Sequence, residues 1–537
     1  MVLADFLESL LHAALLGGAA LALGGVAWGL AVVRAWRGDQ PRVAVVRCLA
    51  LVGAGATLVA VCQAARLAAK TLALSQSLGH DALAEFATTL HFGAGSARVV
   101  LALGLAGAAA WLARAPATRR RWLVVGALAA ALAVSGGWLS HATGRLQHRG
   151  PLVALTVLHQ AAVAVWLGGL VQLVALWPVA RQNPEIAAGW PALLSRFSRL
   201  AMASVSVLIL TGVPLAWVYV GTVRGLVGSG YGSLVLTKAA LLCVALALAA
   251  PSAWTIRRRP AASRSARRTD LPALAEAETI ILVMALFTAS GLSAQPPAAD
   301  LPAADQATVA EVVETFRPKV PSLRTPSLDA MRSSRAPGER SADAYRWSNF
   351  SHNVAGLILL GTSLTALAGV AARRPWPWAQ PVGFVALAAF IYLRAAANEG
   401  TWPFGAVELG QLDAEGIQHR LAAVLVLALG VVEWRARGVR PSRTWLPYVV
   451  PALAAGGAVL LLTHSHTAFQ PKPSFLVQVT HTTMGALGAL MVTARWLELR
   501  LGPPADRLAG GAAALAMLLV ALVLLFYREA NVVVPTG

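Results

Sequence analysis

Long, uninterrupted runs of apolar residues recur along the whole chain, separated by short polar segments. Each run holds about 20 residues, enough for a helix to cross a bilayer core of about 30 Å. Because lipid offers the backbone no hydrogen-bond partners, such runs must be helices or barrel strands. They are continuous rather than alternating and rich in Ala and Leu, which favours helices. The first run, Phe6–Val33, is too long for a signal-peptide core and lacks a basic start, so we expect it to remain as a helix.

The pattern predicts an all-α polytopic integral membrane helix bundle, with about 14 transmembrane helices in two modules. Residues 1–295 form an eight-helix module, 296–348 a periplasmic linker and 349–537 a six-helix module. The linker is rich in Pro, Ala, Ser and charged residues, and a short helix is expected in it near Val309–Phe316. The expected spans lie near residues 5–33, 46–68, 94–113, 122–140, 152–180, 200–221, 233–255, 272–294, 350–372, 380–397, 416–436, 446–465, 475–497 and 508–527.

The composition agrees with a membrane protein, and the charge sets its orientation. The chain is 57% hydrophobic and 13% charged, with a net charge of +20. Almost all of this excess falls in loops on one side of the predicted bundle, for example at Arg119–Arg121 and Arg257–Arg259. The positive-inside rule makes that side cytoplasmic and both termini periplasmic. The basic excess therefore indicates the lipid bilayer as partner and no nucleic acid.

Other common site chemistries receive no support from the sequence. No nucleotide-binding loop, catalytic triad or metalloprotease motif is present, so we expect neither an enzyme nor an ATP-driven pump. The three cysteines, Cys48, Cys62 and Cys243, lie in or at the inner ends of predicted helices, which predicts no disulfide framework.

The histidines are the main candidates for site residues. All eleven lie in outer loops or in the outer halves of predicted helices. A simple interfacial role suffices for His80 and His148, but His12, His159 and His481 lie about two turns inside apolar helices, where polar groups are costly. Neutral imidazole is a common ligand of copper, zinc and haem iron. The candidate metal ligands are His12, His91, His141 and His159 in the first module, and His352, His419, His464, His466, His481 and Met484 in the second.

Several of these residues allow two interpretations. Met484 follows His481 by three residues and shares its helix face, which suits a soft Cu(I) site, although a core methionine is as compatible with the pattern. Arg98 and Arg420, close to candidate histidines, would repel a bare cation and would suit haem propionates. Glu278, with Glu276, suits a proton relay or cation site, or pairing with Arg267 and Arg268. For Gly168 and Gly169, we expect simple helix packing.

Four sequence motifs of the first module resemble the copper resistance protein D (CopD) family of bacterial inner-membrane proteins. They are WLSHATG (Trp138–Gly144), LHQAAVAVWLGGLVQL (Leu158–Leu173), SRFSRLAMASVSVLILTG (Ser195–Gly212) and YGSLVLTK (Tyr231–Lys238). The resemblance covers roughly residues 1–297, and the second module is similar to a C-terminal extension of some members. It implies copper handling at the inner membrane, with a small periplasmic copper-binding protein as partner. The family pattern matches at His141, His159, Trp166, Gly168 and Gly169.

The sequence thus favours copper transport or transfer at the inner membrane, as copper uptake or resistance, with copper bound at periplasm-facing histidines. Two alternatives stay open. One is a b-type haem protein that moves electrons, with axial ligands such as His352 or His419 paired with His464 or His481. The other is a membrane scaffold for a periplasmic copper chaperone. The Met-rich stretches of many copper carriers are absent, since the seven methionines are scattered.

Overall fold

The structure, a computed structural model, describes residues 2–34, 42–78, 85–258, 271–327, 342–373, 376, 378–398, 414–437, 439, 444–463 and 471–529. Throughout these ranges the regular secondary structure is helical. Twelve of the helices are long and apolar enough to cross a membrane, which confirms the all-α polytopic class. The count of 14 stays a prediction, because α6 (Arg119–Gly137) and α17 (Leu446–Leu462) are not among the twelve.

The chain divides into two compact units. Unit 1 comprises Leu3–Gly221 and Leu242–Ala294, and unit 2 comprises Thr222–Leu241 and Gln295–Gly537. The boundary after Ala294 coincides with the end of the apolar part of the first predicted module. The segment Thr222–Leu241, which lies inside that module in the sequence, groups with the second unit. The three-part division expected from the sequence stays a prediction.

Unit 1 is organised around a long central helix, α7 (Arg149–Gln182). It contacts α6, α8, α11 and the first helix. The first helix is continuous but irregular, because two π-helical turns, η1 (Ala20–Gly24) and η2 (Gly29–Val33), flank the short α2 (Gly25–Trp28). The other helices of this unit are α1 (Val2–Ala19), α3 (Arg42–Leu78), α5 (Leu90–Arg114), η3 (His141–Gly144), α8 (Pro184–Val220) and α11 (Leu271–Leu292).

Glycines set the close approach of α7 to the first helix. A Cβ at Gly168 would overlap the Ala20 carbonyl oxygen, and one at Gly24 would overlap the Ala164 carbonyl oxygen. Neither position can carry a side chain unless the backbones separate. Gly169 instead faces the ring of Phe197, and a Cβ there would lie 2.5 Å from Cε2 of that ring. The expected packing role of the two α7 glycines is therefore confirmed, and it is the small-residue packing typical of membrane helices.

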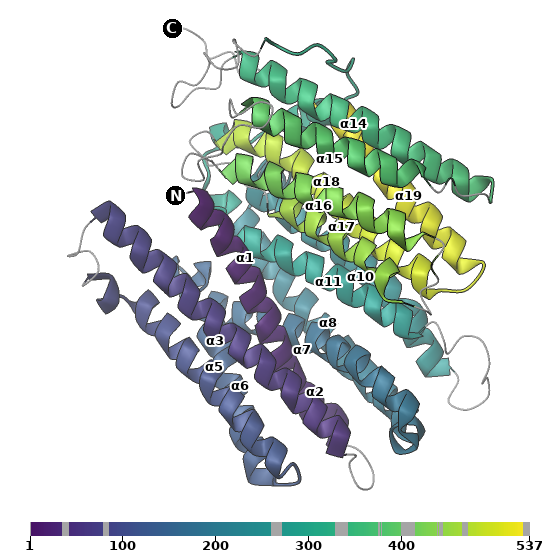
Figure 1. Cartoon of the computed structure of the whole chain (residues 1–537). Helices are drawn as coiled ribbons and strands as arrows, with labels where there is room; N and C mark the ends of the chain where they lie inside the picture. The colour runs from purple at the N-terminus through teal and green to yellow at the C-terminus, as the bar shows by residue number, and fades with distance from the viewer. Residues whose placement is uncertain are drawn as a thin grey trace. The chain divides into compact units, whose positions relative to one another are not determined.

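The contacts between neighbouring helices make unit 2 a closed ring of six helices. Figure 1 shows these helices lying beside one another. Along the chain each of α14 (Ala342–Ala371), α15 (Ala379–Asn398), α16 (Ala414–Ala436), α17, α18 (Pro471–Arg500) and α19 (Ala505–Leu525) contacts the next, and α19 contacts α14. A core of Ala355, Leu359, Leu387, Met517 and Ala521 joins three of them. The helix α10 (Gly230–Arg258) begins in unit 2 and ends in unit 1.

The described part of the predicted linker is folded against the rest of unit 2. The expected short helix is present as α12 (Val309–Phe316) and begins with a capping box between Thr308 and Glu311. Glu311 also forms an ion pair with Lys472 at the start of α18. Upstream, η4 (Ala298–Asp300) and η5 (Ala303–Asp305) precede Gln306, whose carbonyl oxygen accepts a hydrogen bond from Arg224 in α9 (Val223–Val227).

Candidate functional site

One face of α7 carries the first group of candidate residues. Nδ1 of His159 lies 3.2 Å from Oγ1 of Thr211 on α8. That hydroxyl donates its own hydrogen to the Val207 carbonyl oxygen at 2.7 Å, so its oxygen accepts from His159. Gly212 lies against the imidazole: a Cβ there would be 2.9 Å from Cε1 of His159. The network therefore places the hydrogen on Nδ1 and the lone pair on Nε2 of His159.

Further along the same face lies a buried carboxylate. Nε1 of Trp166 donates to Oε1 of Glu278 on α11 at 2.7 Å, and the two residues are 2% and 5% exposed. His159 and Trp166 are seven residues apart, so they share a face of α7 and differ in height by about 10 Å. The Glu278–Trp166 contact was not expected from the sequence. The expected alternative partners, Arg267 and Arg268, lie outside the described residues.

His12 and His141 belong to unit 1 as well. Nδ1 of His12 lies 2.7 Å from Oγ of Ser293, and that hydroxyl donates to the Ser290 carbonyl oxygen at 2.6 Å. As at His159, the network assigns the hydrogen to Nδ1 and the lone pair to Nε2. His141 lies in η3 and acts electrostatically on His12. His141 shares this electrostatic influence on His12 with Arg66, Arg98 and Lys70. His91 lies beside Lys70, whose Nζ is 3.3 Å from Nε2 of His91.

In unit 2, two candidate histidines meet. The imidazoles of His352 on α14 and His481 on α18 have centroids 5.6 Å apart and are nearly perpendicular. Nδ1 of His352 donates to the Ser348 carbonyl oxygen at 2.8 Å, and Nδ1 of His481 donates to that of Val477 at 3.0 Å. Both rings therefore carry the lone pair on Nε2, which is the form of imidazole that binds metal.

Neighbouring residues hold this histidine pair in position. The ring of Tyr527 stacks on His352 with a centroid distance of 4.1 Å. Asn353, which is fully buried, donates to the carbonyl oxygens of Leu524 and Tyr527 at 3.1 and 3.0 Å and so fixes the end of α19 beside α14. A Cβ at Gly356 would overlap the backbone nitrogen of Leu525. Tyr527 and Asn353 were not singled out from the sequence; Asn353 lies directly beside His352, and Tyr527 gives no signal of its own.

The remaining candidates of the second module are only partly described. His419 on α16 acts electrostatically on His352, and Met484 is buried, 2% exposed, one turn beyond His481. His464 and His466 lie outside the described residues, so convergence of the four expected histidines stays a prediction. Within the ranges given above, no group of three or more His, Cys, Asp or Glu side chains could hold a metal ion.

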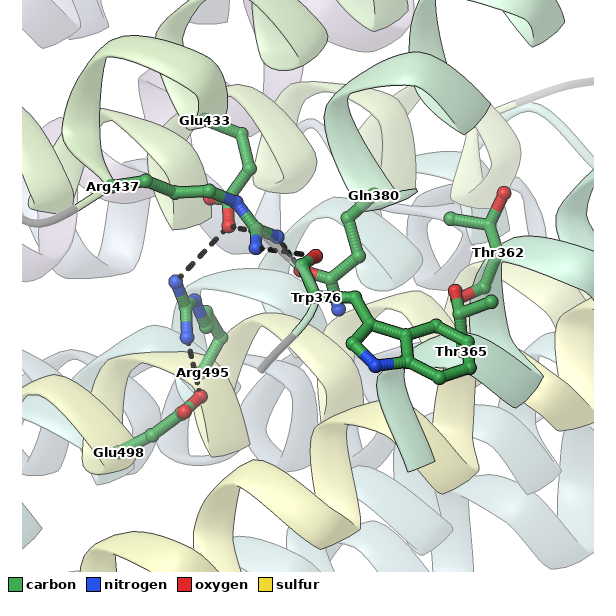
Figure 2. Close-up of polar contacts among 8 residues, drawn as sticks. All are labelled: Thr362, Thr365, Trp376, Gln380, Glu433, Arg437, Arg495 and Glu498. Carbon is green, nitrogen blue, oxygen red and sulfur yellow. Dashed lines mark hydrogen bonds and ion pairs between the residues drawn. The ribbon is translucent and has the colours of Figure 1, made fainter. Parts of the chain in front are cut away.

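A separate polar network lies at one end of the six-helix ring (Figure 2). Glu433 on α16 pairs with Arg437 at 3.2 Å and with Arg495 on α18 at 3.5 Å, and Arg495 also pairs with Glu498 at 2.6 Å. Arg437 donates to Gln380 on α15 and to the Trp376 carbonyl oxygen. Burial lowers the pKa of Arg437 from its ordinary value, although Glu433 opposes that shift. The charges balance within this network, so we assign it a role in joining helices.

Comparison with known proteins relates part of this chain to a copper resistance family. Residues 191–292 match the sequence profile of the family described as copper resistance protein D. This segment is similar to the copper resistance protein D family. The matched segment includes both Thr211 and Glu278, the partners of His159 and Trp166 on α7.

A named copper transport protein is also similar to part of this chain. The copper transport protein CutJ of Bacillus subtilis (strain 168) is 26% identical to this chain over 144 residues. The aligned region is 27% of this chain and 25% of that protein, so the similarity covers only a quarter of the relative's length. No solved structure matches the chain.

Proposed function

We propose that the chain transports copper across the bacterial inner membrane, and that copper in unit 1 passes from His159 toward Glu278. One observation carries this proposal. His159 and Trp166 share one face of α7, and their partners, Thr211 and Glu278, both lie in the segment that matches the copper family. Imidazole nitrogen and carboxylate oxygen are both metal ligands. Ionisable groups at membrane depth are functional candidates because burying them is costly.

The hydrogen bonds of four candidate histidines support metal binding. Metal-bound histidines usually donate the hydrogen of the other ring nitrogen to a neighbouring oxygen, which fixes the ring and its tautomer. His12, His159, His352 and His481 all have Nδ1 held in this way, by Ser293, Thr211, Ser348 and Val477 respectively. Nε2 therefore carries the lone pair in each. In this proposal these rings face the periplasm and receive copper from a small periplasmic copper-binding protein.

The test compares two histidines from the same region of the chain. Cells producing the full chain, H159A or H148A are loaded with copper, and cell copper is measured by elemental analysis at equal protein levels. We expect wild type and H148A to change cell copper equally relative to cells without the protein, and H159A to lose that change. Loss of a metal ligand should weaken copper binding by about tenfold or more. Equal copper levels in H159A and wild type would contradict the proposed path.

The histidine pair of unit 2 favours a second candidate function, a b-type haem protein. Two imidazoles with Nδ1 held by backbone carbonyls are suited to bind one iron from two sides as well as to bind copper. A visible spectrum of the purified protein separates the two functions. A Soret band that disappears in H352A and H481A would support haem. Bound copper without such a band, lost in the same variants, would support transport.

A further inference from the structure

Unit 1 contains a second polar region, between α3 and α5. Gln63 and Lys70 are seven residues apart on α3, and His91 and Arg98 are seven apart on α5, so each pair shares one helix face. These two faces oppose each other. Nζ of Lys70 lies 3.3 Å from Nε2 of His91, and a Cβ at Gly95 would lie 3.0 Å from Nε2 of Gln63.

Positive charge exceeds negative charge in this region. Arg66 donates to Oε1 of Glu8 through both Nε and Nη2, at 2.9 and 2.6 Å, and Nζ of Lys70 lies 3.9 Å from the same oxygen. Arg98, on α5, is close enough to Arg66 to be repelled by it. Among the side chains that the structure describes, Glu8 balances one of the three cations, which leaves two positive charges in excess. Such a region favours a bound anion.

Among these three cations, Arg98 has the fewest interactions that balance its charge. Its side chain is 4% exposed, and its hydrogen bond is to the neutral hydroxyl of Ser135 at 3.3 Å. Within the part of the chain that the structure describes, its Nε has no hydrogen-bond partner and no carboxylate pairs with it. A Cβ at Gly136 would lie 2.7 Å from its Nη1, so this glycine leaves the space that the guanidinium fills. A buried charge without a counter-charge costs several kcal/mol.

A small pocket opens next to these cations. Its cavity volume is about 10 Å³, room for one water-sized occupant, and it is partly open to the surroundings. It is lined by Gln63, Arg66, Leu67, Lys70, His91 and Leu139. Gln63 is 2% exposed, yet its Oε1 has no hydrogen-bond partner among the described residues. A half-turn of this amide would present Nε2, which donates hydrogen bonds, to the pocket. An anion there would meet donors from Lys70, Arg66 and Gln63.

We propose that this pocket binds one small inorganic anion of the halide class, which compensates the excess charge of Lys70, Arg66 and Arg98. The anion supplies the negative charge that the described residues do not. This inference is independent of the copper path, because it rests on other residues and on charge balance alone.

The test measures thermal unfolding of the full-length protein in detergent. Sodium gluconate is replaced stepwise by sodium chloride or bromide at constant ionic strength. A ligand that binds the folded state raises the unfolding midpoint in a saturable way. We expect this rise for wild type and for R121Q, a matched control in the same unit whose guanidinium is bonded to the Trp111 carbonyl oxygen. In K70Q, the half-saturating halide concentration should increase about tenfold.

Lys70 is the preferred test residue because it is 39% exposed, so its replacement leaves the core intact. A bromide peak in an anomalous difference map between α3 and α5 would support the proposal directly. Equal midpoints in gluconate and halide, or equal halide responses in K70Q and R121Q, would overturn it. Stabilisation by phosphate or acetate without any by halides would overturn the halide class.

Discussion

Single residues decide which histidines are held in a metal-binding form. The sequence identifies the histidines by type and depth, but the tautomer of each depends on its hydrogen-bond partner, which for His159 and His12 lies far away in the chain. Thr211 fixes His159 and Ser293 fixes His12. Hydroxyl residues are frequent in apolar helices, where they bond to their own backbone, so nothing in the pattern marks these two.

The first prediction concerns the contact between Gly212 and His159. In G212A the new methyl group would lie 2.9 Å from Cε1 of His159 and would move the ring away from Thr211. We expect G212A to lose most of the copper transport while keeping its amount in the membrane. The control is G107A, whose Cβ meets nothing within 4 Å. Transport by G212A at the level of G107A would show that the ring position is unimportant.

At the scale of elements, the sequence predicts where the helices lie along the chain far better than it predicts which helices pack against each other. Hydropathy defines which segments are long and apolar enough to cross a bilayer, and the twelve confirmed spans follow it. Neighbours depend on which faces carry small residues, and Gly24 and Gly168 form such a contact from distant parts of the chain. Both glycines can be read from a single sequence, but their contact cannot be predicted from it.

The ion network of Figure 2 gives a prediction at this scale. Glu433 is 5% exposed and joins α16 to α18, whereas Glu498 is 31% exposed and pairs within α18. Removing one partner of a buried pair costs about 3 kcal/mol, and removing an exposed pair within a helix costs about 0.5 kcal/mol. We therefore expect E433Q to lower the unfolding midpoint by several degrees and E498Q to lower it little. Equal shifts in a thermal unfolding assay would show that burial does not decide the strength of these pairs.

At the scale of the whole molecule, the orientation in the membrane is still a prediction from charge. Reporter tags after Arg258 and Arg440 should give cytoplasmic signals, and a tag near Ser333 should give a periplasmic one. The reason is the concentration of arginine on one side of the predicted bundle. A periplasmic signal from either arginine-rich loop would reverse the topology, and the candidate histidines would then face the cytoplasm.

The division into units has a consequence for how this chain could be cut or recombined. Thr222–Leu241 belongs to unit 2, although it lies between two stretches of unit 1. A fragment that ends at Ala294 would carry this segment without the residues on which it packs, and a fragment that begins at Gln295 would lack it. No single break in the chain therefore yields two complete halves. If relatives exchanged one module at a single junction, the product would combine Thr222–Leu241 of one parent with the rest of unit 2 from the other. We therefore expect the sequences of the two units to change together.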